Sequence, residues 1–113
     1  MNIVPISAQQ ILEKTLENLQ GRANSRGECY GGEILDCMKD AGTALGVDVL
    51  EIQVTRTILV RTMESLGENY PAHVLQNYDH RMPLPNAVKY LREAIAWTKR
   101  RQLNNAQRGL AKV

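Results

Sequence analysis

The chain has 113 residues, of which 43% are apolar and 23% are charged. This length and composition suit one globular domain with its own hydrophobic core, and they exclude an intrinsically disordered chain. The net charge is only +2, but residues 89–113 hold seven Lys/Arg against one Asp/Glu, whereas residues 1–88 hold seven against eleven. Basic charge is therefore concentrated at the end of the chain.

Targeting signals and disulfides are not expected. Cys29 and Cys37 are too few for a small disulfide scaffold, and no apolar run reaches the roughly 18 residues that cross a bilayer. Residues 1–7 lack the basic and apolar segments of a signal peptide. We therefore expect a cytoplasmic protein with reduced thiols and no membrane contact.

The first helix is predicted over residues 8–20. Ser7 and Gln10 form a capping-box pattern just before an apolar stripe of helical period. Gly21 stands where a left-handed residue would end the helix. The next residues, 21–32, read GRANSRGECYGG, and their four glycines predict a loop.

A second helix is predicted over 32–45 and a third over 49–66. The second has one apolar stripe that includes Cys37, and Gly46 should end it. Asp48 and Glu51 form the capping box of the third. Many of its residues are β-branched, but their spacing follows a helix better than a strand.

Two more helices complete the prediction. Pro71 suits the first turn of a short helix over 71–79, and the segment RMPLP that follows should be extended. The last helix is predicted over 86–103, with a basic, flexible tail over 104–113. The expected fold is therefore all-α, a compact bundle or orthogonal array of about five helices that forms a single domain over 1–103.

Residues 38–55 have the spacing of a helix-turn-helix. Gly42 would let two helices cross closely, Gly46 would make the turn, and Ile52 would pack across it. In the exposed first turns of the second helix only Gln53 suits base recognition, and the carboxylates of Asp48 and Glu51 would repel phosphates. A plain helical corner is the favoured interpretation.

The basic end of the chain is the main candidate binding site. It could contact a nucleic-acid backbone, with an indole ring as a stacking platform, or an acidic protein. It could equally be a solvated helix end whose cations complement the helix dipole. The candidate residues are Lys89, Arg92, Trp97, Lys99, Arg100, Arg101 and Arg108.

Metal and catalytic sites are not predicted. The soft ligands are spaced C-x7-C and H-x6-H, whereas structural zinc sites use closer pairs. Cys29 is the one candidate nucleophile, and only Arg26 nearby could lower its pKa. The glycines before the second helix lack the lysine and the strand of a P-loop, and Glu28 and Glu33 disfavour a bound anion. We therefore expect no enzyme activity, metal or cofactor.

The third helix has more apolar residues than one stripe needs. Val49, Leu50, Val54 and Val60 lie partly outside the side that holds Ile52, Leu59 and Met63. Surplus apolar surface is buried by another helix of the chain or by a partner. The sequence therefore predicts a small non-enzymatic binding protein, an adaptor, inhibitor or regulator, with a homodimer as one version. The alternative is a nucleic-acid-binding or transcription-regulatory protein that uses the basic end or segment 38–55.

Overall fold

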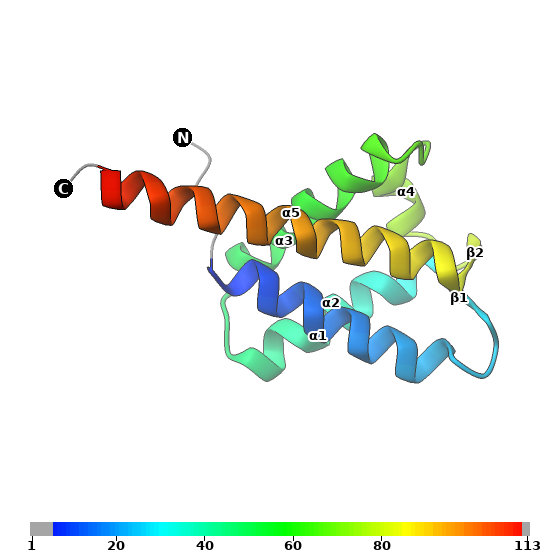
Figure 1. Cartoon of the computed structure of the whole chain (residues 1–113). Helices are drawn as coiled ribbons and strands as arrows, with labels where there is room; N and C mark the ends of the chain where they lie inside the picture. The colour runs from blue at the N-terminus through cyan, green and yellow to red at the C-terminus, as the bar shows by residue number, and fades with distance from the viewer. Residues whose placement is uncertain (1–5, 112–113) are drawn as a thin grey trace.

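A computed structural model describes the backbone of residues 6–111 and the side chains of residues 7–103. Within this range the chain forms five helices and one two-stranded sheet (Figure 1), which confirms the all-α prediction. The elements in chain order are α1 (Ile6–Ala23), β1 (Glu28–Tyr30), α2 (Gly31–Leu45), α3 (Val49–Ser65), α4 (Pro71–Leu75), β2 (Arg81–Pro83) and α5 (Leu84–Ala111).

The corner between α2 and α3 forms as the sequence predicts. Gly46 ends α2 in the left-handed region, with φ of +69°. The Glu51 N–H donates to Asp48 Oδ1 at 3.0 Å, and the Asp48 N–H donates to Glu51 Oε2 at 3.2 Å. A Cβ on Gly42 would lie 2.6 Å from Ile52 Cγ1, so the two helices cross too closely for a side chain at this position.

The start and end of α1 differ from the prediction. The helix begins at Ile6, so Ser7 lies inside it rather than capping it. The Ser7 hydroxyl donates instead to Glu51 Oε1 of α3 at 3.1 Å. Gly21 also lies inside α1, and the chain turns at Gly27, whose φ is +71°. A tertiary contact thus replaces the local cap that the sequence pattern suggested.

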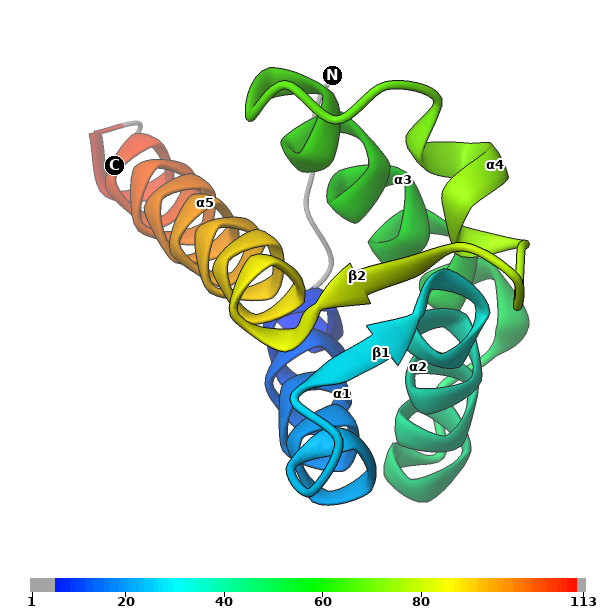
Figure 2. The ribbon, with the colours of Figure 1, turned by 90° about the vertical axis from the view of Figure 1, so that its right-hand side faces the viewer.

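The predicted loop over 21–32 holds a short strand. Cys29 of β1 pairs with Met82 of β2 in an antiparallel register, so residues 81–83 of RMPLP are extended as expected. Leu84 and Pro85 of the same segment are already helical, and α5 begins there instead of at residue 86. The Gly31 N–H donates to the His80 carbonyl at 2.9 Å and continues this pairing into α2. Figure 2 shows the sheet lying across the end of the helices where α5 begins.

The last two helices also need corrected bounds. Pro71 begins α4 as predicted, but the helix ends at Leu75 instead of residue 79. The backbone of α5 stays helical to Ala111, past the expected end at residue 103. The predicted flexibility of residues 104–113 stays a prediction, because their side chains lie outside the described residues.

The core lies among α1, α2, α3 and α5, and it is mainly aliphatic. The largest fully buried side chains include Ile11, Leu12, Leu19, Ile34, Met38, Leu59, Met63, Leu75 and Leu91. Cys37 is buried with them, as its position in the apolar stripe predicts. Among the described residues, no helix is both long enough and apolar enough to span a membrane.

Candidate functional site

The predicted basic surface of α5 is only partly assembled. Lys89, Arg92 and Arg100 are exposed and have no carboxylate partner among the described residues. Lys99 Nζ lies 4.0 Å from Glu13 Oε1 of α1, which partly neutralises its charge. These cations therefore spread along α5 instead of converging on one point.

Trp97 and Arg101 are the predicted site residues that the structure brings together. The Arg101 guanidinium lies over the indole ring, 5.3 Å from its centroid. Trp97 is half-buried and packs against the core, so its ring is only partly available for stacking on a base. The side chain of Arg108 lies outside the described residues.

Cys29 lacks the surroundings of an activated nucleophile. It is only 1% exposed, and burial raises its pKa from 9.0 to about 11. Arg26 is engaged by Glu33, whose two carboxylate oxygens lie 2.7 Å and 2.8 Å from Arg26 Nη2. The thiolate is thus disfavoured at neutral pH, which argues against Cys29 as a nucleophile.

The charged side chains of the glycine-rich segment each pair with a residue outside it. Tyr30 lies between two guanidinium groups, 5.7 Å from Arg26 and 5.0 Å from Arg81. Arg81 also donates to Glu28 Oε1 at 3.0 Å and to the Tyr30 hydroxyl at 2.8 Å. This network ties β1 to β2 and to the start of α2, and both of its guanidinium groups are paired with carboxylates.

The histidines do not form a site with the cysteines. His73 and His80 are exposed, whereas Cys29 and Cys37 are buried. In the part of the chain that the structure describes, no three His, Cys, Asp or Glu residues are placed to hold a metal ion.

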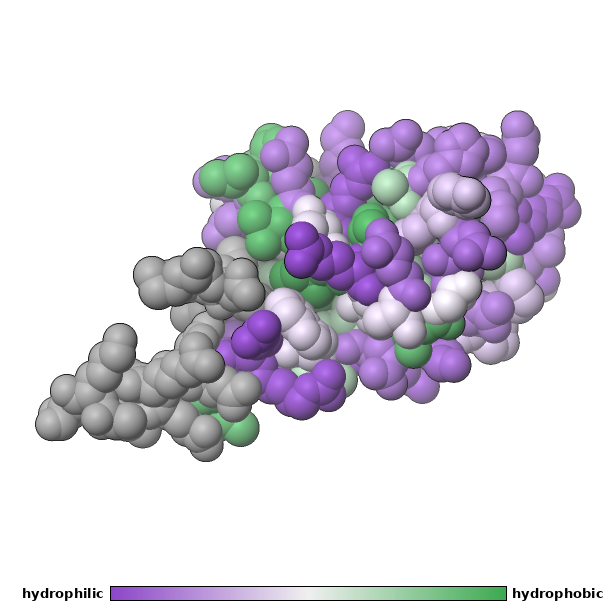
Figure 3. All heavy atoms as spheres, turned by 90° about the horizontal axis from the view of Figure 1, so that it is seen from above, coloured by the Kyte–Doolittle hydropathy of each residue, from purple (hydrophilic) through white to green (hydrophobic). Residues whose placement is uncertain are grey.

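Exposed aliphatic side chains gather where α2 meets α3. Leu45 is 40% exposed, Val49 68% and Leu50 67%, and we call these three residues the apolar corner. The other surplus residues of α3, Val54 and Val60, are half-buried against the core. On the face in Figure 3, hydrophobic surface gathers toward the left end, the side on which α3 begins in Figure 1.

A hollow of about 680 Å³ runs along α3 beside α4, and we call it the α3 hollow. Its lining residues are Gln53, Arg56, Thr57, Val60, Arg61, Glu64 and Ala72. Within the described part of the chain, the side chains of Arg56 and Arg61 form neither a hydrogen bond nor an ion pair. Sequence reasoning missed both arginines because it considered only the first turns of α3, although their helical spacing places them outside the buried stripe.

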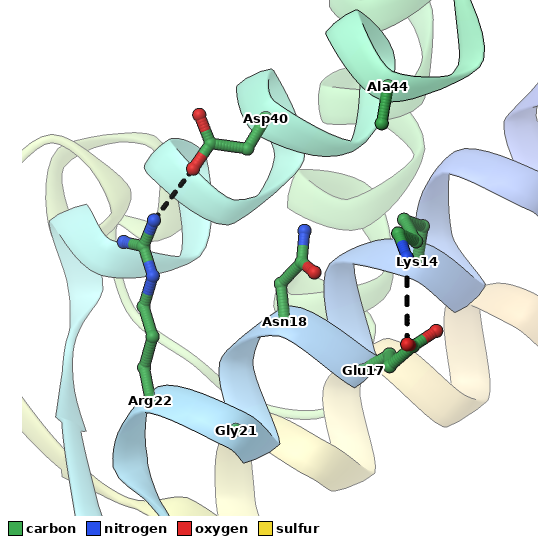
Figure 4. Close-up of a pocket in the computed structure, with 7 residues that line it drawn as sticks. All are labelled: Lys14, Glu17, Asn18, Gly21, Arg22, Asp40 and Ala44. Atoms are coloured by element: carbon green, nitrogen blue, oxygen red, sulfur yellow. Dashed lines mark hydrogen bonds and ion pairs between the residues drawn. The ribbon is translucent and has the colours of Figure 1, made fainter.

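A second hollow, of about 460 Å³, lies between α1 and α2 (Figure 4). Its charged side chains are already matched. Arg22 and Asp40 point toward one another, with Arg22 Nη2 lying 2.6 Å from Asp40 Oδ2. Lys14 Nζ lies 3.5 Å from Glu17 Oε1. This hollow therefore offers a ligand fewer unsatisfied groups than the α3 hollow does.

Compared with known protein families, curated proteins and solved structures, the chain matches none of them. Two of its surfaces involve α3: the apolar corner, where α2 meets it, and the α3 hollow, where α4 borders it.

Proposed function

We propose that this chain is a small non-enzymatic binding protein, an adaptor, inhibitor or regulator, that acts through protein–protein contacts made by α3. The observation that carries the proposal is the apolar corner. Val49 and Leu50 are each about two-thirds exposed in the first turn of α3, at 68% and 67%. They contribute little to the core, so their burial by a partner would stabilise a complex.

The position of these residues on the helix strengthens the argument. The first turn of a helix favours acidic side chains, because its free N–H groups carry partial positive charge. Glu51 follows that preference, whereas Val49 and Leu50 do not. The capping box holds the first turn in place, so both aliphatic side chains are presented to solvent on a rigid element.

Protein capture from extracts of the producing cells tests the proposal. The double variant Val49→Lys/Leu50→Lys should lose partners that the unchanged chain retains after nuclease treatment. Leu103→Lys is the matched control, since Leu103 is also exposed, at 59%, but lies on α5. Circular dichroism should show that all variants keep the helical fold. The proposal fails if the double variant captures the same proteins as the unchanged chain.

Light scattering tests the homodimer version separately. A dimer held by the apolar corner should become a monomer in Val49→Lys/Leu50→Lys and stay a dimer in Leu103→Lys. A monomer at high micromolar concentration of the unchanged chain would exclude this version and leave a different protein as the partner.

A second candidate function is nucleic-acid binding by α5. It is favoured by the exposure of Lys89, Arg92 and Arg100, none of which has a carboxylate partner among the described residues. An electrophoretic shift at low salt should retard DNA or RNA, with affinity that falls steeply as salt rises. Reversal of Lys99, Arg100 and Arg101 to Glu should abolish the shift. The absence of any retardation would remove this candidate.

A further inference from the structure

The arginines of the region before α5 divide into two groups. Each arginine of the first group has a guanidinium nitrogen close to a carboxylate oxygen. These pairs are Arg22 with Asp40 at 2.6 Å, Arg26 with Glu33 at 2.7 Å and Arg81 with Glu28 at 3.0 Å. Arg56 and Arg61 pair with nothing in the described part of the chain, and both line the α3 hollow. Glu64 lies one turn after Arg61 and still forms no ion pair with it. Both unpaired arginines therefore border the same concave surface.

We infer that the α3 hollow receives an acidic segment of the protein partner, whose carboxylates pair with Arg56 and Arg61. The inference rests on the proposed function and names the chemistry of the partner. A guanidinium group binds a carboxylate through two parallel N–H donors. This geometry gives stronger binding to a partner whose carboxylates lie at matching positions. Arg56 and Arg61 are five residues apart, about 7.5 Å along the helix axis.

The rest of the hollow suits a peptide. Val60 is half-buried and Ala72 of α4 is exposed, so both offer apolar contact between the arginines. The side-chain amide of Gln53 can bond to a peptide backbone, whereas the Thr57 hydroxyl already donates to the Gln53 carbonyl at 3.1 Å. An acidic segment with interspersed apolar residues matches this lining.

A line of exposed side chains connects the hollow with the apolar corner. Leu50, Gln53, Thr57 and Arg61 follow one another at helical spacing and are all exposed, so they form one line along α3. From Val49 to Glu64 this surface extends over about 22 Å, the length of a partner segment of about 15 residues if that segment is helical. The partner segment should be apolar where it meets the corner and acidic where it meets the hollow.

The charges of α3 favour a protein over a nucleic acid as the occupant. Double-stranded DNA carries a charge about every 1.7 Å along its axis. Such a row of phosphates would meet Glu64 inside the hollow and Asp48 and Glu51 at the start of the helix. A peptide can place its carboxylates only at Arg56 and Arg61 and so avoid this repulsion.

Selection from a random library of 16-residue peptides tests the inference. Peptides that bind the unchanged chain should be enriched in Asp or Glu pairs three to five residues apart, beside apolar residues. In fluorescence anisotropy, Arg56→Glu/Arg61→Glu should weaken the selected peptides about tenfold or more, a factor that corresponds to about 1.4 kcal/mol. Replacement of the peptide's acidic residues by Lys should restore binding to this variant.

Controls separate this inference from the proposed function. Lys39→Glu reverses an exposed charge on α2 and should leave the affinity unchanged. Peptides that lose affinity with Val49→Lys/Leu50→Lys but not with Arg56→Glu/Arg61→Glu would overturn the inference and keep the proposed function. If the library yields no binding peptide, or if every variant binds equally, the inference fails, and the capture experiment decides the proposed function separately. A 16-base-pair DNA duplex that binds through Arg56 and Arg61 while no peptide does would overturn the inference in favour of a nucleic acid.

Discussion

At the scale of single residues, the space around the Cα atom decides whether Gly31 and Gly21 could be replaced by a residue with a side chain. A Cβ on Gly31 would overlap the backbone carbonyl of Val74, because the start of α2 packs directly on α4. A Cβ on Gly21 would meet nothing within 4 Å. The sequence predicts both glycines in one loop, with Gly21 as a left-handed helix end, and it does not show that only Gly31 lies against another backbone.

Substitution by alanine should therefore act in opposite directions at these positions. We expect Gly31→Ala to lower the free energy of unfolding by about 2 kcal/mol, since backbone atoms must move apart. Gly21→Ala should raise it by about 0.5 kcal/mol, because alanine restricts the unfolded chain and fits the helix. Urea denaturation measures both changes. Equal effects of the two substitutions would contradict the close packing of α2 on α4.

At the scale of elements, the start of α3 is a case in which neighbouring residues alone are sufficient to predict where a helix begins. Asp48 and Glu51 satisfy backbone N–H groups that a helix leaves free, and the helix begins at Val49 as predicted. The short strand β1 shows the opposite case. Its partner β2 lies more than fifty residues away, with Tyr30 opposite Arg81, and three residues carry too little pattern to indicate a strand.

Removal of the cap should destabilise the protein by a modest, defined amount. Asp48→Ala leaves the Glu51 N–H without its acceptor, and we expect a loss of about 1 kcal/mol in the free energy of unfolding. Asp79→Ala is the control, because the Asp79 carboxylate has no partner among the described residues, and its effect should stay within about 0.5 kcal/mol. Both variants can be compared by urea denaturation. A loss for Asp48→Ala no larger than the control's would show that the box contributes nothing to stability.

At the scale of the whole molecule, stability should fall at alkaline pH. Burial raises the pKa of Cys29 and of Cys37 from 9.0 to about 11. The hydrogen bond that Tyr90 donates to Glu68 at 2.7 Å raises the pKa of Tyr90 from 10.0 to about 12. Above pH 9 the folded state thus holds protons that the unfolded state has lost, and the free energy of unfolding decreases as pH rises.

Urea denaturation between pH 8 and 11 measures this decrease. Tyr90→Phe should be less stable than the unchanged chain by about 1 kcal/mol at pH 8, because the hydrogen bond to Glu68 is lost. The difference between the two proteins should shrink above pH 10, where the unfolded tyrosine ionises. A difference that stays constant across this range would exclude the Tyr90–Glu68 bond as its source.

Local sequence patterns were enough to predict the helical class of this protein, the α2–α3 corner and most of the buried stripes. These features follow from caps, glycines and apolar spacing, which act over one or two helical turns. Three other features depend on the folded arrangement: which arginines are paired, where α4 borders α3 and how the two strands meet. Such contacts join residues far apart in the chain, and no local pattern shows that Arg22 reaches Asp40 while Arg56 and Arg61 reach no carboxylate among the described residues.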